Sequence, residues 1–238
     1  MKKSIAFITD LHIDEAFPIE HGVDARANFE RILADLRSRD IEQVFIGGDI
    51  GENAALEWFF DTLNDFKLDL VLGNHDEFKA VRKHHSSKLS NDSSEWFYTF
   101  DDPFFTYIFM DSSSATISDT QFNWLQAAVQ TTKDILLFIH HPILPVQTIV
   151  DQKYPLYDRD MVQNLLSSLP NKVTVFCGHY HTNDEQKVGN ITQYVTAACS
   201  FQALKNTEET VVDTSNFGYR LIHLDGIKIK TQPILFDS

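Results

Sequence analysis

A chain of 238 residues, 43% of them hydrophobic and 19 of them Phe, is long enough to fill one core, and we expect a single domain over residues 1–238. Its formal net charge of −14 repels a nucleic-acid backbone and an anionic lipid surface, which argues against general nucleic-acid binding and against membrane binding. Charges of both signs and many aromatic side chains argue against a disordered chain.

The chain begins MKKSIAFITDLH, in which basic residues precede an apolar run of about five residues, shorter than the apolar region of a secretory leader. No apolar run approaches the length of a membrane-spanning helix. Cys177 and Cys199 lie in apolar segments without the paired spacing of a zinc site, so we expect two reduced, buried thiols. Together these features predict a soluble protein of the cytoplasm.

Six apolar runs of strand length occur along the chain, and they do not alternate between apolar and polar residues. Such continuous runs are typical of strands that are covered on both faces. Amphipathic helical patterns lie between several runs, and Ser118 is placed to cap one of them. The alternation predicts an α/β sandwich whose strands are largely parallel in the first half. The predicted strands are residues 4–9, 43–47, 68–73, 105–110, 135–139 and 173–177, and the predicted helices are residues 24–39, 54–66, 118–129 and 158–169.

Two other segments depart from this pattern. The last third of the chain has shorter apolar runs and a tight-turn signal at Asp225-Gly226, so we expect antiparallel strands and a hairpin there. Residues 79–95, KAVRKHHSSKLSNDSSE, form the most polar stretch and are expected to be a mobile surface loop.

Polar side chains follow five of the predicted strands directly. In an open α/β sheet, ligands bind beyond the carboxyl ends of the strands, so these side chains are expected to meet. Imidazole, carboxylate and amide groups are ligands of Zn, Mn and Fe, and they are too many for one tetrahedral ion but about enough for two ions that share a carboxylate. The residues are Asp10 and His12, then Asp49, then Asn74, His75 and Asp76, then His140 and His141, and finally His179 and His181.

The local spacing supports a common metal centre. The two residues of D-x-H and of H-x-H stand two apart, so an extended segment points both side chains the same way. Glycines 48, 73 and 178 come immediately before predicted ligands and are expected to let the backbone pack closely there. Each motif alone is weak, but polar clusters placed directly on apolar strands are costly unless something pairs with them.

The ordered series D-x-H, G-D, G-N-H-D, H and G-H-x-H, from Asp10 to His181, resembles the calcineurin-like metallophosphoesterases. The resemblance implies a four-layer α/β/β/α sandwich with a dinuclear metal site at the carboxyl ends of the strands. It also implies two divalent or mixed-valence ions of Mn, Fe or Zn. One ion would be bound by Asp10, His12 and His181 and the other by Asn74, His140 and His179, with Asp49 bridging the two.

The resemblance further implies that His75 contacts the substrate and protonates the leaving group. Two cations about 3.5–4 Å apart would lower the pKa of a bridging water, and the resulting hydroxide would attack phosphorus. An imidazole with a pKa near 6.5 can supply the proton that a leaving alkoxide needs. Glu52 and Asp76 are the predicted acids that orient His75, and Glu52 is favoured because similar family members carry an acid at that offset.

Several residues keep more than one interpretation. His141 is expected to support a neighbouring ligand or to face solvent, because successive side chains of an extended segment point in opposite directions. Asp111 is expected to cap a turn. His84 and His85 are expected to be solvated, and a substrate-facing role stays open for Arg82, Lys83 or His85. Tyr180 and Phe201 can each either pack in the core or flank the substrate.

The compact chain, the segment DTQFNWL and the C-terminal third look like class III cyclic nucleotide phosphodiesterases. This similarity implies hydrolysis of small phosphodiesters, above all 3′,5′-cyclic nucleotides such as cAMP, and a homodimer. The tail departs from the usual pattern near TAACS and at Phe217, which leaves the substrate open. The alternatives are a phosphomonoester, a glycerophosphodiester or a nucleotide–lipid pyrophosphate as substrate, or a non-catalytic scaffold, which the presence of His75 argues against.

Overall fold

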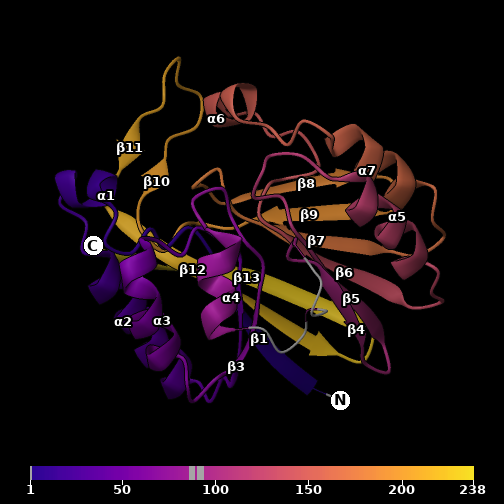
Figure 1. Ribbon diagram of the computed structural model, residues 1–238, viewed down its shortest axis with the longest axis horizontal. Coiled ribbons are helices and arrows are strands. Elements are labelled where there is room, and N and C mark those ends of the chain that lie inside the picture. The colour runs from indigo at the N-terminus through magenta and orange to yellow at the C-terminus, as the bar shows by residue number, and fades with distance from the viewer. Residues whose placement is uncertain (1, 86–88, 90–93) are drawn as a thin grey trace.

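The structure is a computed structural model that describes residues 2–85, 89 and 94–238 (Figure 1). The strands are β1 (Lys2–Ile8), β2 (Gln43–Ile46), β3 (Lys67–Leu70), β4 (Tyr98–Asp101), β5 (Phe105–Met110), β6 (Asp134–Ile139), β7 (Val173–Cys177), β8 (Asp184–Val188), β9 (Ile191–Val195), β10 (Gln202–Ala203), β11 (Val212–Asp213), β12 (Asn216–Asp225) and β13 (Lys228–Asp237). The helices are α1 (Ala16–Glu20), α2 (Ala25–Ser38), α3 (Leu56–Thr62), which follows a 3₁₀ turn (Asn53–Ala55), α4 (Phe78–His84), α5 (Asp119–Ala128), α6 (Ile149–Lys153) and α7 (Arg159–Ser167).

Two large sheets and a short ribbon organise these strands. The first sheet has five strands in the order β13-β12-β1-β2-β3, and the second has six in the order β4-β5-β6-β7-β9-β8. β1, β2 and β3 run parallel, as do β5, β6, β7 and β9, whereas β12 and β13 form an antiparallel hairpin that continues the first sheet. The six predicted strands and the predicted hairpin are confirmed.

The two sheets face each other across a core of aromatic side chains. Phe45 of β2 meets Phe138 of β6 and Phe109 of β5, with ring centroids 4.8 and 5.2 Å apart. Phe7 of β1 also contacts Phe138, at 5.8 Å, and all four rings are fully buried. Because interiors are packed as densely as crystals, this interface fixes where the carboxyl ends of one sheet lie relative to those of the other.

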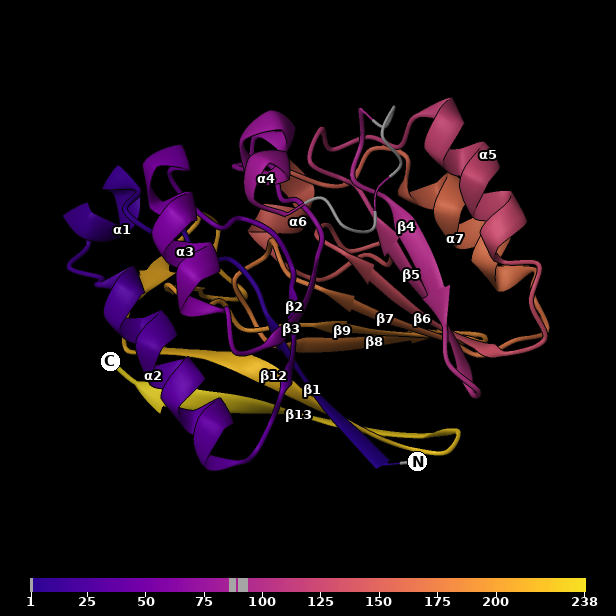
Figure 2. The same cartoon turned by 60° about the horizontal axis from the view of Figure 1, so that its bottom comes forward.

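Helices cover the outer faces of both sheets (Figure 2). α2 and α3 pack on the five-stranded sheet through side chains such as Phe29 and Phe59, and α5 and α7 pack on the six-stranded sheet through Leu125 and Val162. Ser118 accepts a hydrogen bond from Gln121 N at the start of α5, as predicted. The four layers confirm the α/β/β/α sandwich.

The polar segment 79–95 is only partly as predicted. α4 takes up its beginning, because Ala80 and Val81 bury one side of this short helix while its charged residues remain outside. Residues 86–88 and 90–93 lie outside the described part of the chain. The apolar side was too short to be recognised among so many polar residues.

Cys177 and Cys199 are free, buried thiols, as predicted, and burial raises the pKa of both.

Among the residues described, the structure contains no helix with the length and apolar character needed to cross a membrane.

Candidate metal centre

The loops that follow the parallel strands are bonded to one another. Asp10 N donates to Gly48 O at 3.0 Å, which joins the loops after β1 and β2. Gly178 N donates to His140 O at 3.0 Å, which joins the loops after β6 and β7. The Asp10 carboxylate then accepts a hydrogen bond from His179 N, with 3.0 Å to each oxygen, and so connects the two sheets. These bonds satisfy the buried backbone groups and hold the loops in place.

The three glycines that precede predicted ligands stand where a side chain has no room. Gly48 has φ +93°, and a Cβ there would lie 2.3 Å from Gly73 N. A Cβ on Gly73 would lie 2.1 Å from Asp49 Oδ1, and a Cβ on Gly178 would lie 2.4 Å from Asp10 Oδ2. The expectation that these glycines allow close backbone packing is confirmed.

Replacing Gly178 by Ala is expected to weaken metal binding before it disturbs the fold. The added methyl group would press on the Asp10 carboxylate and force it to turn. We expect metal affinity to fall roughly 10–100-fold, the usual cost of losing a ligand's support. Titration of metal-free protein with Mn²⁺ measures this. Gly189→Ala is the control for backbone strain away from the ligands, because Gly189 has φ +57° and the added methyl group would meet nothing within 4 Å. Equal affinity in the two variants would contradict the prediction.

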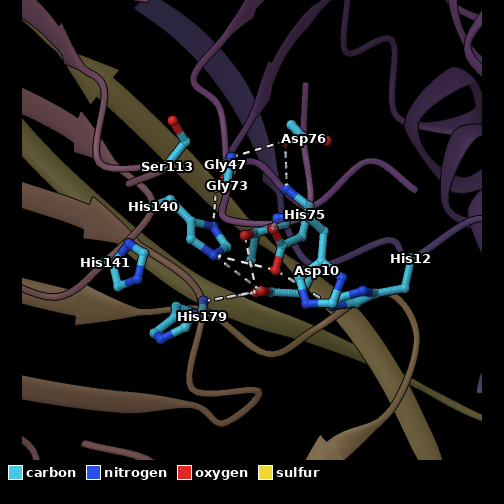
Figure 3. A network of polar contacts seen from close by, with 12 residues as sticks. Asp10, His12, Gly47, Gly73, His75, Asp76, Ser113, His140, His141 and His179 are labelled. Carbon is cyan, nitrogen blue, oxygen red and sulfur yellow. Dashed lines mark hydrogen bonds and ion pairs between the residues drawn. The ribbon is translucent and has the colours of Figure 1, made fainter. Parts of the chain in front are cut away.

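Six of the seven predicted ligands gather into overlapping groups whose ligating atoms lie within 4.8 Å of one another. Figure 3 shows the rings of His140 and His179 beside Asp10. Asp49 stands between the groups, with its Oδ2 3.5 Å from His12 Nε2 and 3.3 Å from His140 Nε2. We call these six residues the ligand cluster: Asp10, His12, Asp49, His140, His179 and His181.

Each imidazole of the ligand cluster bonds an outer acceptor with one ring nitrogen. A carbonyl or carboxylate acceptor requires an N–H, so it fixes the tautomer and leaves the other nitrogen free to ligate. The bonds are His12 Nδ1 to Glu15 Oε2 at 2.9 Å, His140 Nδ1 to Gly47 O at 2.7 Å, His181 Nδ1 to Phe201 O at 2.8 Å and His179 Nε2 to Tyr154 O at 2.9 Å.

The ligand cluster also concentrates backbone strain. Of the nine non-glycine residues with positive φ in the described chain, five belong to it, with φ between 46° and 67°. The left-handed region costs an L-residue about 1–2 kcal/mol. Strain of this kind persists where the surrounding structure imposes it, and it gathers at functional sites. The five residues are Asp10, His12, Asp49, His179 and His181.

The donor atoms of the ligand cluster fit metal ions. His140 Nε2 is buried and, among the described residues, makes no hydrogen bond, although it lies 3.3 Å from Asp49 Oδ2. His12 Nε2 and His181 Nε2 face each other at 3.1 Å, a contact that calls for a proton or a cation. A buried polar atom without a partner is costly, and a cation would remove that cost. Nitrogen and oxygen donors suit Zn, Mn or Fe.

The electrostatics of the site favour cations as well. Burial and a neighbouring imidazole lower the pKa of His181 to about 3 and the pKa of His179 to about 4, so both rings are neutral, as a metal ligand must be. Burial alone would raise the pKa of Asp49, but the imidazoles of His140 and His12 outweigh burial and hold that pKa well below its usual range. The shared carboxylate is therefore ionised.

A pocket of about 370 Å³ opens onto the ligand cluster, and we call it the central pocket. Its wall includes His75, whose side chain is 45% exposed and whose backbone N donates to Asp49 Oδ1 at 2.9 Å. His75 Nδ1 lies 3.0 Å from Glu15 Oε2. This hydrogen bond outweighs burial and raises the pKa of His75 to about 9, so the ring carries a proton that it can donate.

The acid beside His75 is not the one that the sequence favoured. Glu52 is exposed to solvent, and the Asp76 carboxylate faces the backbone, where it accepts N–H bonds at 2.8 Å from residues 49, 50 and 73. Glu15 occupies the position instead. Sequence reasoning missed Glu15 because an acid near the start of a helix is common, and its spacing of three residues from His12 was the only signal.

His141 lies inside the site and not at the surface. Its ring is buried, its Nδ1 is 3.0 Å from Ser112 Oγ, and its centroid is 3.9 Å from that of His179. The side chains of His140 and His141 were expected to point in opposite directions, as successive residues of a strand do. β6 ends at Ile139, however, so residues 140 and 141 are not part of the strand. Asn74, which is predicted to bind one ion together with His140 and His179, lines the central pocket and is exposed.

The residues with two interpretations have the following contacts. Tyr180 is buried and its hydroxyl donates to Asp151, and its side chain also lines the central pocket. Phe201 lines the central pocket, with its ring centroid 4.4 Å from that of His181. Asp111 Oδ1 accepts from Ser113 N at 2.9 Å, which confirms the predicted turn cap.

The basic residues around α4 lie outside the central pocket. Arg82 and Lys83 line a separate hollow, and the rings of His84 and His85 stack on Phe60 at 5.4 and 6.0 Å. The expectation that His85 is solvated is therefore only partly met.

The four-layer sandwich places imidazoles and carboxylates that could hold metal ions together at its strand ends. A family model described as the calcineurin-like phosphoesterase superfamily domain matches residues 3–212, and the chain belongs to this superfamily. It is therefore a metal-dependent phosphoesterase.

Two curated relatives of this chain are named as phosphodiesterases. A protein of Fibrobacter succinogenes named "Probable cyclic nucleotide phosphodiesterase" is 28% identical over 225 residues, which cover 92% of this chain and 88% of the relative. A protein of Enterobacter lignolyticus named glycerophosphodiester phosphodiesterase GpdQ is 26% identical over 196 residues, which cover 74% of this chain and 70% of the relative.

Solved structures share the fold at low identity. A dimetal phosphatase from Danio rerio superposes with a TM-score of 0.66 at 13% identity, over 96% of this chain and 98% of that one. GAP50, described as the anchor in the inner membrane complex of Plasmodium, gives the same TM-score and identity over 98% and 84%. Proteins of such different description share this fold, so activity has to be argued from the site.

Proposed function

We propose that this protein hydrolyses small phosphodiesters, above all 3′,5′-cyclic nucleotides such as cAMP, with two ions of Mn, Fe or Zn. The observation that carries the proposal is the ligand cluster at the base of a small pocket with aromatic walls. In this proposal, Asp10, His12 and His181 hold one ion and Asn74, His140 and His179 hold the other, with Asp49 shared. When bound, such ions supply Lewis acidity that activates water and withdraws charge from the phosphoryl group.

The walls of the central pocket support a substrate with an aromatic group. Phe17, Tyr154 and Tyr157 line it although their side chains are 47%, 59% and 69% exposed. Exposed aromatic side chains gathered at a pocket mark a binding surface, and stacking on a nucleobase is worth about 1–3 kcal/mol per base. A volume of about 370 Å³ is at the small end for ligand pockets, which favours a small substrate.

The charge of the pocket walls supports a diester in preference to a monoester. Within the described chain, the residues that line the central pocket include no Lys or Arg. A phosphomonoester is a dianion and is usually held by such cations, whereas a diester carries a single charge. The bound ions alone would have to neutralise a monoester or a pyrophosphate.

The residues around the reacting phosphate have separable roles in this proposal. His75, held through Nδ1 by Glu15, turns its other nitrogen to the pocket and donates a proton to the oxygen of the departing alcohol. Water adds to phosphorus as that P–O bond breaks, so a cyclic nucleotide becomes a nucleoside monophosphate. Glycerophosphodiesters are the second candidate substrate, favoured by the relative named GpdQ.

A substrate panel tests this function. With each of Mn²⁺, Fe²⁺ and Zn²⁺, we expect kcat/KM for cAMP to exceed kcat/KM for AMP by at least about tenfold, which corresponds to about 1.4 kcal/mol. Tyr157→Ala should raise KM for cAMP by about fivefold or more, since stacking contributes about 1 kcal/mol or more. The same variant should leave KM for glycerophosphoethanolamine unchanged, because this substrate has no aromatic ring to stack.

Ile227→Ala is the matched control for Tyr157→Ala, because Ile227 is 66% exposed on the turn between β12 and β13. Faster turnover of AMP than of cAMP would overturn the diester assignment. Faster turnover of glycerophosphoethanolamine than of cAMP would favour the second candidate. Protein that binds the metals yet cleaves no phosphoester would support the scaffold alternative.

A further inference from the structure

One carboxylate oxygen contacts two functional imidazoles. Glu15 Oε2 lies 2.9 Å from His12 Nδ1 and 3.0 Å from His75 Nδ1. The two rings are perpendicular, with centroids 4.7 Å apart. The side chain of Glu15 is 13% exposed, so water competes little for these bonds.

This arrangement fixes the tautomer and the direction of both rings. A carboxylate oxygen only accepts, so each Nδ1 that faces it has to carry a hydrogen. The Nε2 of His12 is then free to ligate, and it points at His181 Nε2 and Asp49 Oδ2. The opposite edge of His75 is left for the central pocket, whose wall it forms.

We propose that Glu15 is a positioning residue that couples the metal-binding ring of His12 to the proton-donating ring of His75. Loss of this carboxylate would loosen one ion and misplace the proton donor at the same time. The inference rests on the proposed function, because it assigns proton donation to His75.

Neighbouring acids in the structure do not share this position. Asp14 stands next to Glu15 in the chain, yet its carboxylate pairs with Arg26 at 2.5 Å. Glu52 lines a small hollow together with Glu15 and His75, but it is exposed to solvent. Asp14 therefore serves as the control for Glu15, and Glu52 is the competing candidate for the acid that positions His75.

Leaving-group dependence tests the coupling to His75. At metal concentrations that saturate both sites, we expect Glu15→Ala to lower kcat about 10–100-fold on diesters with alkyl leaving groups, the usual cost of removing a ligand's supporting partner. Diesters with a nitrophenyl leaving group, which needs no proton, should be nearly unaffected. Glu15→Gln keeps an oxygen acceptor and should recover part of the loss. Glu15→Ala combined with His75→Ala should be no slower than His75→Ala alone.

Metal titration tests the coupling to His12 without any assay of activity. Calorimetry of metal-free protein with Mn²⁺ should show two sites in Glu15→Ala, one of them weakened about 10–100-fold. Asp14→Asn, which removes the adjacent carboxylate, should bind both ions as the unaltered protein does. If the unaltered protein bound a third Mn²⁺ ion that Glu15→Ala does not bind, the inference would be overturned, because Glu15 would then be a metal ligand.

Three further results would overturn the inference: equal losses in Glu15→Ala for both kinds of leaving group, multiplicative losses in the double variant, or the leaving-group effect appearing in Glu52→Gln instead. The failure of the proposed function would look different. Unaltered protein inactive on every diester would overturn that function, and the metal titration would then decide whether Glu15 supports His12.

Discussion

Replacing His75 by Ala is expected to leave both metal positions filled and to remove most turnover of substrates with poor leaving groups. His75 reaches the ligand cluster through its backbone, since its N–H donates to Asp49 Oδ1 and an Ala keeps that bond. Its imidazole bonds Glu15 and borders the pocket. General acid catalysis contributes about 10²–10⁴-fold, and we expect kcat on alkyl diesters to fall by that amount.

A series of diesters with alkyl and nitrophenyl leaving groups measures this loss, together with elemental analysis of bound metal. The loss should shrink steadily as the leaving group improves, because a good leaving group departs without a proton. His223→Ala is the control, since His223 bonds Ser4 at the far end of β1. Unchanged turnover of alkyl diesters would remove His75 from the role of acid.

Changing Asp49 to Asn is expected to have the largest effect of any single substitution. Asp49 Oδ2 faces His12 and His140 at 3.5 and 3.3 Å, so both proposed metal sites lose a shared negative charge. Each ion contributes several kcal/mol to catalysis, and about 4 kcal/mol corresponds to 10³-fold, so we expect activity to fall by more than about 10³-fold. The amide still accepts the His75 N–H bond, so the loop should keep its shape.

Metal content and melting temperature together report on this variant. Metal-free Asp49→Asn should melt below the metal-free unaltered protein, because the buried imidazoles of His12 and His140 lose the carboxylate that faces them. Added Mn²⁺ should raise the melting temperature of the unaltered protein only, since a ligand stabilises the state that binds it. Asp69→Asn is the control, because Asp69 is equally buried but bonds the Tyr98 hydroxyl. Two tightly bound ions in Asp49→Asn would contradict the shared role.

The amino-acid sequence determined which residues form the ligand cluster, because the signal is local. An apolar run that ends in Asp, Asn or His marks both a buried strand and a polar group at its end. The predicted strands were all confirmed, and six predicted ligands were brought within reach of one another. The glycine positions were readable for the same reason, since each stands next to its ligand in the chain.

Only the tertiary structure decided how those groups are supported and what reaches them. Glu15 is an ordinary acid in the sequence, and it gains a role because the fold brings a ring from residue 75 against it. The ring of His141 lies inside the site because β6 ends at Ile139, so His140 and His141 are not part of the strand. The aromatic wall joins Phe17 to Tyr157, which are far apart in the chain. Contacts between distant segments depend on how two sheets pack, and no local pattern of residues contains that information.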